Sequence, residues 1–196
     1  MSETWGIILA AGESKRMQAL KLLLTFKGKT ILEHSLDNVL RSGLDHVLVV
    51  LGHEADRIKE IIGNRKVSIV INHDFRDGML SSIKCGFRAL TPHAEAALVY
   101  LADQPMIPPA VTDAVLDEWQ KTGAGMVVPV NNGRRGHPLL VDMKYRYEVM
   151  ELNPETGLRE LLQKFPEDLV EVSVPDHSIL EDIDTREDYM KMKANN

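Results

Sequence analysis

Short apolar runs alternate with stretches of helical period along most of this 196-residue chain, and this alternation restricts its fold more than any other feature. The apolar runs are largely continuous, which is typical of strands buried on both faces; they cover residues 5–10, 46–51, 67–71 and 96–101. The apolar periodicity predicts helices over residues 30–41 (with Gly43 as C-cap), 54–62, 80–90 and 108–121. Strands that alternate with helices in this way indicate an α/β protein.

The second half of the chain interrupts the alternation once. Two predicted strands, 125–130 and 138–142, follow each other and are separated only by a polar loop. A helix at 156–164, a strand at 169–174 and a closing helix at 185–193 complete the pattern. We therefore expect one domain over residues 1–196, a three-layer α/β/α arrangement whose mostly parallel, mixed sheet includes one antiparallel strand near 130–138.

Composition and charge exclude several classes of protein. The chain has 44% hydrophobic and 27% charged residues, the balance of a soluble globular protein, and a net charge of −6 that disfavours nucleic acid as a partner. The longest apolar runs are far shorter than the ~20 residues of a membrane span, and no basic leader segment begins the chain. The lone cysteine, Cys85, allows no intramolecular disulfide. These features predict a cytoplasmic protein.

The charge is unevenly distributed along the chain. Residues 1–30 carry a net charge of +3, whereas residues 147–196 carry −8. A basic beginning on an acidic chain suggests that anions are bound near the start. A chance fluctuation over a solvated surface explains the same numbers, so charge alone leaves both interpretations open.

The end of the first predicted strand carries the run LAAGESKRM, residues 9–17, followed by Lys21. Small residues such as Ala11 and Gly12 let backbone N–H groups approach a phosphate closely, and Arg16 and Lys21 suit a triphosphate. An ordinary solvated turn is the alternative. The P-loop pattern is excluded because Leu23 replaces its first glycine, and no G-x-G-x-x-G follows a strand.

Carboxylates at two places are candidate metal ligands. Asp103 ends a buried apolar strand, where a carboxylate needs a cation or hydrogen-bond donors. Magnesium bound with a nucleotide phosphate is one such partner, and capping of the next segment is the other use of an Asp there. Asp182 and Asp184 alternate along an extended stretch and share one face, so they either hold a metal or repel each other in solvent. Thr185 and Asp188 are expected to cap the closing helix.

Two further motifs contain polar groups suited to ligands. Gly78, Ser81 and Ser82 open a predicted helix, where N–H groups and hydroxyls bind a base edge or an anion. Helix capping explains one of the serines but not both. Arg135 and His137 lie in a basic loop beside a strand, which suits an anionic second substrate or a simple solvated loop.

Taken together and in this order, the motifs resemble those of the MobA-like molybdenum cofactor nucleotidyltransferases, especially the MocA-like cytidylyltransferases. The run from Leu9 to Met17 with Lys21 is the most specific part, and the sequences LADQP at 101–105, GHP at 136–138 and DIDT at 182–185 support it. The resemblance extends over nearly the whole chain, and it implies a Rossmann-like enzyme that transfers a nucleoside monophosphate to molybdopterin and releases pyrophosphate, with Mg²⁺ as cofactor.

The resemblance also implies roles for individual residues. Its implied catalytic residues are Arg16, Lys21 and Asp103, its metal ligands are Asp103 and Asp184, and its acceptor-binding residues are Arg135 and His137. The implied nucleotide-binding residues are Leu9, Ala10, Ala11, Gly12, Ser14, Arg16, Lys21, Gly78, Ser81, Ser82 and Asp103.

The resemblance favours CTP over GTP, because guanylyl-transferring relatives tend to have Gly-Gly where this chain has Ala10-Ala11. One departure is Gln18, where the family often has glycine. Two further hypotheses stay open. One is a different phosphate acceptor, such as a sugar phosphate or methylerythritol phosphate. The second is a non-enzymatic carrier that delivers cofactor to a molybdenum hydroxylase apo-enzyme.

Overall fold

The computed structural model describes residues 3–17 and 19–195. Within these residues the main sheet has eight strands in the order β10-β7-β9-β6-β1-β4-β5, with β8 (Arg134–Arg135) paired to β7. Strand β1 (Glu3–Ala10) is parallel to β4 (His46–Leu51) and β6 (Ala94–Leu101), and β5 (Ser68–Ile71) is parallel to β4. Strand β9 (Leu139–Asp142) runs antiparallel between β6 and β7 (Met126–Asn131), and β10 (Leu169–Ser173) is parallel to β7. The predicted mostly parallel mixed sheet is confirmed.

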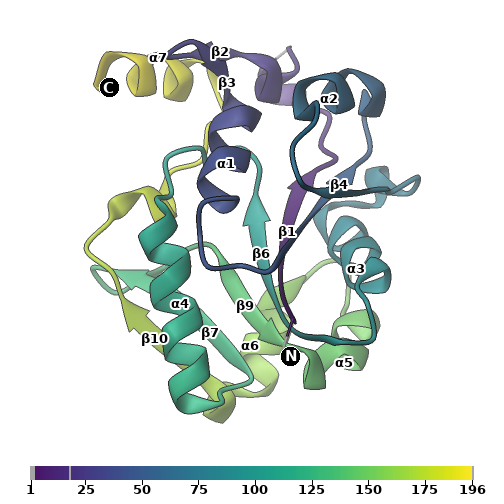
Figure 1. Ribbon diagram of the computed structural model, residues 1–196, viewed down its shortest axis with the longest axis vertical. Helices are drawn as coiled ribbons and strands as arrows, with labels where there is room; N and C mark the ends of the chain where they lie inside the picture. The colour runs from purple at the N-terminus through teal and green to yellow at the C-terminus, as the bar shows by residue number, and fades with distance from the viewer. Residues whose placement is uncertain (1–2, 18, 196) are drawn as a thin grey trace.

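Helices cover both faces of this sheet, as Figure 1 shows. On one face lie α1 (Ile31–Val39), α2 (Ala55–Ile62) and α4 (Pro109–Thr122), and on the other α3 (Met79–Ala89), α5 (Arg146–Glu151) and α6 (Leu158–Lys164). Alternate residues of β1 enter the two cores, with Ile8 on the α1 side and Ile7 on the α3 side. In the described ranges, no helix combines the length and apolar character needed to cross a membrane.

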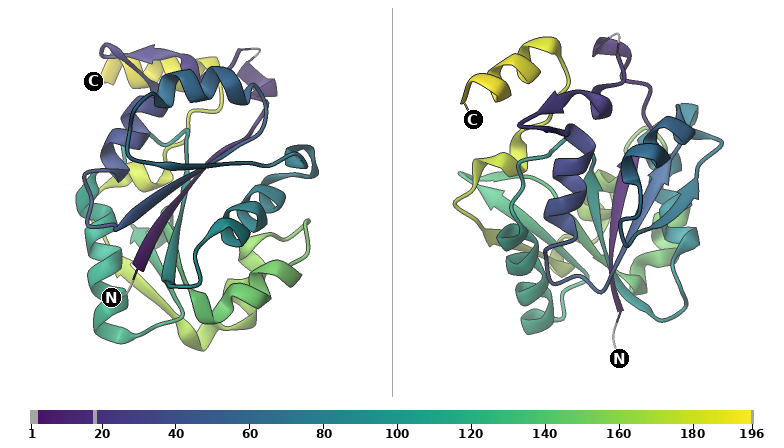
Figure 2. Two further views of the ribbon diagram at one scale, coloured as in Figure 1. Left: turned by 45° about the vertical axis from the view of Figure 1, so that its right-hand side comes forward. Right: turned by 45° about the horizontal axis from the view of Figure 1, so that its top comes forward.

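The strand order reverses at β1. From β1 the sheet continues through β4 to β5 on one side, and the chain then returns to β6 on the other side of β1. In open α/β sheets, ligands bind outside the carboxyl ends of the strands at such a reversal. A hairpin of β2 (Thr25–Phe26) and β3 (Lys29–Thr30) and the closing helix α7 (Arg186–Asn195) lie at this end, at the top of Figure 1. They are side by side (Figure 2), and the Tyr189 hydroxyl donates to the Thr25 carbonyl at 2.6 Å.

Several short elements were not predicted. These are the β2–β3 hairpin, strand β8, helix α5 and the 3₁₀ turns η1 (Lys15–Met17), η2 (Lys21–Leu23), η3 (Phe75–Asp77), η4 (Met143–Tyr145), η5 (Pro166–Asp168) and η6 (His177–Leu180). Most are too short to display a period in the sequence. The expected C-cap at Gly43 is wrong, since α1 ends at Val39 with Leu40 as its right-handed C-cap.

Helix α3 approaches the sheet closely at Gly86. A Cβ atom on Gly86 would lie 2.7 Å from Ile7 Cγ2 and 3.3 Å from Val50 Cγ2. Both Ile7 and Val50 are fully buried, so neither side chain has room to move away. Glycine at this position therefore allows the helix that follows the Gly78 turn to rest directly on β1 and β4.

We expect Gly86→Ala to lower the free energy of unfolding by about 1–2 kcal/mol through overpacking, despite the gain of about 1 kcal/mol that alanine brings to a helix interior. Urea denaturation provides the measurement. The matched control is Gly43→Ala, where a Cβ atom would lie an ordinary 3.4 Å from Asp113 Oδ1. A Gly86→Ala protein as stable as wild type would show that α3 is not held against the sheet at this distance.

Candidate active site

A cleft of about 440 Å³ opens at the carboxyl ends of β1 and β6. Its walls come from the loop after β1, the Asp103 turn after β6, the start of α3 and the segment before α7. Most of the predicted site residues meet there, namely Leu9, Ala10, Ala11, Gly12, Ser14, Arg16, Lys21, Gly78, Ser82, Asp103 and Asp184. The strand reversal identified in the fold is therefore also where the sequence motifs converge.

The loop after β1 is fixed by local hydrogen bonds. Ser14 has a left-handed backbone (φ 51°), and its hydroxyl accepts from the backbone N–H of Lys21 at 3.3 Å. The N–H of His53 donates to the Ala11 carbonyl at 3.1 Å, which ties the loop to the end of β4. Arg16 and Lys21 thus project into the cleft from an anchored loop. Gln18, the position that departs from the family pattern, lies outside the described residues.

An ion-pair cluster lies on one side of the cleft. Lys21 Nζ donates to Asp103 Oδ2 at 2.5 Å and to Asp184 Oδ1 at 2.9 Å. The second oxygen of Asp184 accepts from Arg16 Nη2 at 2.8 Å. The Lys21 and Asp103 side chains are each only 16% exposed, whereas Arg16 is 71% exposed. One lysine therefore bridges two carboxylates in a partly desolvated place, and an arginine reaches them from solvent.

The pKa shifts follow from this arrangement. Burial opposes the charge of Lys21, but Asp103 and Asp184 outweigh it and raise the pKa of the lysine above its ordinary value. Burial likewise works against ionised Asp184, yet Lys21 and Arg16 hold its pKa below the usual range. Among the described residues no cation pairs with the neighbouring Asp182, and burial together with the negative charge of Asp184 raises its pKa. On this side of the cleft, Lys21 and Arg16 thus compensate Asp103 and Asp184.

The donor chemistry fits a hard divalent cation that arrives with other ligands. Carboxylate oxygens suit Mg²⁺ or Mn²⁺, and Mg²⁺ commonly takes only one or two of them, with water and substrate phosphates as the remaining ligands. Asp103 and Asp184 supply two such side chains, which face one point now held by the Lys21 ammonium. Within residues 3–17 and 19–195, no three His, Cys, Asp or Glu side chains are grouped to hold a metal by themselves.

The two serines at the start of α3 differ in position. Ser82 is buried and lines the cleft, whereas the described cleft lining does not include Ser81. The Asn72 amide donates to both hydroxyls, at 2.8 Å for Ser81 and 3.0 Å for Ser82. The Ser81 hydroxyl lies 2.8 Å from the Asp74 and Gly78 carbonyls, so it closes the turn before the helix.

The two predicted acceptor-binding residues lie away from the described lining of this cleft. Arg135 belongs to strand β8 rather than to a free loop, and its Nε donates to Glu171 at 2.7 Å. The half-buried His137 ring places Nδ1 3.2 Å from the Val99 carbonyl, and burial lowers its pKa. Arg135 was expected in a loop because its two-residue strand is too short to give a pattern.

Sequence analysis did not predict the apolar side chains that Phe75 and Met79 contribute to the cleft. Phe75 and Met79 both line it, and Met79 is 57% exposed. Phe75 lies close to Gly52 at the end of β4, where a Cβ atom would come within 2.7 Å of the Phe75 Cβ. Their positions on either side of Gly78 were the available signal, since that glycine opens the helix at the cleft.

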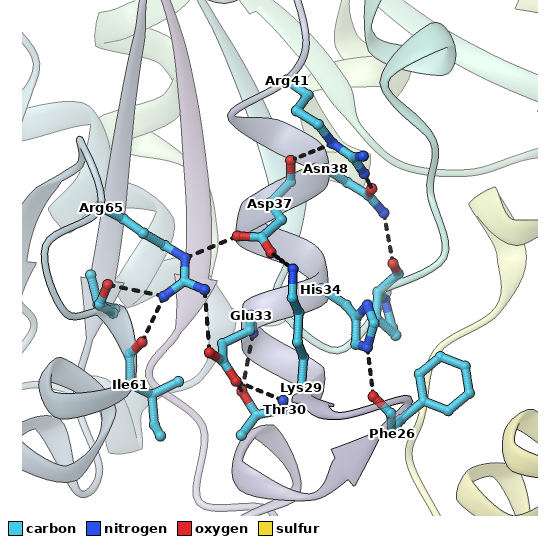
Figure 3. Close-up of polar contacts among 12 residues, drawn as sticks. Phe26, Lys29, Thr30, Glu33, His34, Asp37, Asn38, Arg41, Ile61 and Arg65 are labelled. Atoms are coloured by element: carbon cyan, nitrogen blue, oxygen red, sulfur yellow. Dashed lines mark hydrogen bonds and ion pairs between the residues drawn. The ribbon is translucent and has the colours of Figure 1, made fainter.

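Helix α1 connects the segment around Lys21 with the turn that carries Asp103. His34 Nε2 lies 2.7 Å from the Phe26 carbonyl in the hairpin that follows Lys21, and the Asn38 amide donates to the Pro105 carbonyl at 2.8 Å (Figure 3). The buried Ser35 hydroxyl donates to the Ala102 carbonyl at 2.8 Å, directly before Asp103. The helix therefore fixes the separation of the lysine and its carboxylate partner.

The acidic face of α1 is also tied to the end of α2. Arg65 donates to Asp37 at 3.0 Å, to Glu33 at 3.3 Å and to the Ile61 carbonyl at 2.9 Å (Figure 3). Glu33 forms a capping box with Thr30 at the start of α1. These contacts hold α1 at both of its ends, so its position at the cleft is well determined.

We expect Ser35→Ala to lower the free energy of unfolding by about 1–2 kcal/mol, because the Ala102 carbonyl loses its buried donor. Chemical denaturation tests this. The control is Ser42→Ala, whose hydroxyl donates only to the Val39 carbonyl of its own helix end. Equal stabilities of the two variants would argue against a bracing role for Ser35.

Comparison with known proteins shows which family this chain is similar to. The family model described as "MobA-like NTP transferase domain" matches residues 6–171. The molybdenum cofactor cytidylyltransferase of Escherichia coli is 29% identical over 95% of this chain and 94% of its own length. The nicotine blue oxidoreductase of Paenarthrobacter nicotinovorans is 31% identical over 95% of both chains.

A solved structure has the same fold. The Rv0371C protein of Mycobacterium tuberculosis, crystallised in complex with manganese, superposes with a TM-score of 0.85 over 100% of both chains at 24% identity. That level of identity bears on the fold alone, which it places among the Rossmann-like three-layer proteins.

Proposed function

Because the chain belongs to the MobA-like NTP transferase family, we propose that this nucleotidyltransferase transfers CMP from CTP to the phosphate of a molybdopterin-type acceptor, with Mg²⁺ as cofactor. Its similarity to a molybdenum cofactor cytidylyltransferase over 95% of the chain supports both the nucleotide and the acceptor. A relative in the same fold was crystallised with manganese, which supports dependence on a divalent cation.

The observation that carries the proposal is the cluster of Lys21, Arg16, Asp103 and Asp184 beside the loop of small residues. The loop residues Ala11, Gly12 and Ser14 would bring backbone N–H groups to the triphosphate. The two cations would neutralise its oxygens. Asp103 and Asp184 would hold Mg²⁺, which, when bound, offsets the charge that develops on the departing pyrophosphate.

The transfer reaction depends on the positioning of its reactants more than on acid–base catalysis. A phosphate monoester is already anionic at neutral pH, so the attacking oxygen requires no general base. The enzyme must instead hold two anions in line and stabilise the leaving group. Arg16 is the exposed cation of the cluster and also lines a second cavity of about 750 Å³ next to the cleft. It is therefore suited to reach an acceptor phosphate from that side.

The choice of CTP rests on Ala11. This side chain is 4% exposed, and its Cβ would lie 2.9 Å from a Cβ atom on Gly52, so its methyl group fills the space beside the end of β4. Glycine at this position, which is typical of guanylyl-transferring relatives, would leave that space open. The smaller cytosine base accords with the smaller space.

A second candidate comes from the similarity to a nicotine blue oxidoreductase. We rank oxidoreduction below nucleotidyl transfer, because the sequence has no G-x-G-x-x-G after a strand and the cleft gathers groups suited to phosphates. A different phosphate acceptor and a carrier role toward a molybdenum hydroxylase also rank below transfer to molybdopterin. Oxidation of NADH or NADPH without pyrophosphate release would favour the oxidoreductase, and tight molybdopterin binding unaffected by nucleotide would favour the carrier.

We expect pyrophosphate release that requires CTP, Mg²⁺ and molybdopterin together. Asp103→Ala should reduce the rate on the order of 100-fold or more, since it removes a ligand of the Mg²⁺ that would offset charge in the transition state. A coupled pyrophosphate assay measures it, with Asp117→Ala, a carboxylate on α4 away from the cleft, as control. Robust turnover by Asp103→Ala would refute the metal assignment.

We also expect CTP with Mg²⁺ to stabilise the protein against thermal unfolding more than GTP does. A ligand at 100 times its dissociation constant adds about 2.7 kcal/mol to the native state. Ala11→Gly should narrow the difference between the stabilisation by CTP and that by GTP. Because this variant loses a buried methyl group, each shift is measured against the same protein without ligand. A larger shift with GTP in the wild type would contradict the assignment of CTP.

A further inference from the structure

The two carboxylates that suit a metal already share a cation supplied by the chain. The Lys21 ammonium lies 2.5 Å from Asp103 Oδ2 and 2.9 Å from Asp184 Oδ1. The second Asp184 oxygen accepts from Arg16 at 2.8 Å. Asp184 thus has both oxygens engaged by side-chain cations, and the point that both carboxylates face is filled.

A divalent ion cannot use both carboxylates while the ammonium stays between them. Mg²⁺ requires oxygens at about 2.0–2.1 Å in octahedral geometry, whereas these oxygens stand at hydrogen-bond distances from a nitrogen. The ammonium and the metal would also repel each other at such short range. Metal entry between Asp103 and Asp184 therefore means displacement of Lys21.

A polyanion in the cleft would offer Lys21 a different partner. Its backbone is fixed by the hydrogen bond to Ser14, but its four-carbon side chain is flexible. The loop of small residues that suits a triphosphate lines the same cleft. If Lys21 left the carboxylates while the cleft held no ligand, its ammonium would lose its counter-charges in a mostly buried place, because the side chain is only 16% exposed.

We propose that Lys21 occupies the cation position between Asp103 and Asp184 until a nucleoside triphosphate draws it away, so that this lysine couples metal binding to nucleotide binding. The inference rests on the proposed function and specifies how that same site is regulated. It makes Lys21 a coupling residue whose effect is measurable on the free metal, without turnover. Reciprocity of binding free energies then requires the metal to strengthen nucleotide binding by the same factor.

The test is the affinity for Mn²⁺ alone, measured by electron paramagnetic resonance on the intact protein. Lys21→Met should bind Mn²⁺ at least about tenfold more tightly than wild type, within the usual range of such couplings. Lys21→Arg retains the charge and should bind it as weakly as wild type. The matched control is Lys15→Met, which removes a cation from the same cleft that pairs with Glu13 at 2.8 Å instead.

A wild-type measurement keeps the test independent of how the variants fold. In protein with ¹⁵N-labelled lysine, the Lys21 Nζ resonance should stay in place when Mg²⁺ is added alone and move when Mg²⁺ and CTP are added together. A resonance that moves equally with Mg²⁺ alone would overturn the proposal. So would equal Mn²⁺ affinities of wild type and Lys21→Met, or the same gain in Lys15→Met.

Failure of this inference and failure of the proposed function give different results. If Mn²⁺ with CTP stabilises the wild type but Lys21→Met shows no gain in Mn²⁺ affinity, only the coupling role is overturned. If Mn²⁺ with CTP stabilises neither protein and no pyrophosphate is released in the presence of the acceptor, the proposed function fails and the coupling fails with it.

Discussion

The contact of one lysine with two carboxylates is the interaction on which the rest of this site depends. Along the chain, Asp103 lies 82 positions and Asp184 163 positions from Lys21. A backbone hydrogen bond links two of the same segments, since the N–H of Ile183 donates to the Asp103 carbonyl at 3.1 Å. The closing segment is thereby held across the end of the sheet, and α7 reaches the hairpin. A cleft with a wall from each end of the chain exists only because these three segments meet.

The segments that form the cleft need a rigid support, and helix α1 provides it. Its buried face enters the core at Leu32 and Leu36, while Ser35 and Asn38 bond to the turn around Asp103. The interior of such a core is close-packed, so small displacements are costly. Packing through α1 therefore sets the positions of Lys21 and Asp103, and the ion pairs of this partly exposed cluster add the contact to Asp184.

Sequence reasoning predicted the regular parts of the fold and most of the cleft. Continuous apolar strands and capped helices have periods that a sequence displays, and ligand sites at strand ends follow from the sheet. It could not show features that depend on contacts between distant residues. The pairing of Arg135 with Glu171 in β8, and the position of Ser81 outside the cleft, arise from tertiary packing that no local pattern encodes. The family resemblance implied that Asp103 and Asp184 are ligands of one metal, but the sequence did not predict that Lys21 bridges them.

The uneven charge of the chain acquires a physical meaning from this bridge. Arg16 and Lys21 come from the segment of net charge +3, and Asp184 comes from the tail of net charge −8. The two ends of the sequence therefore neutralise each other at the cleft, where burial makes an unpaired charge costly. A triphosphate offers the basic end a new partner, but it leaves the acidic end uncompensated unless a cation enters at the same time. The charge pattern of the sequence thus favours ligands that arrive as a metal–polyphosphate pair over either one alone.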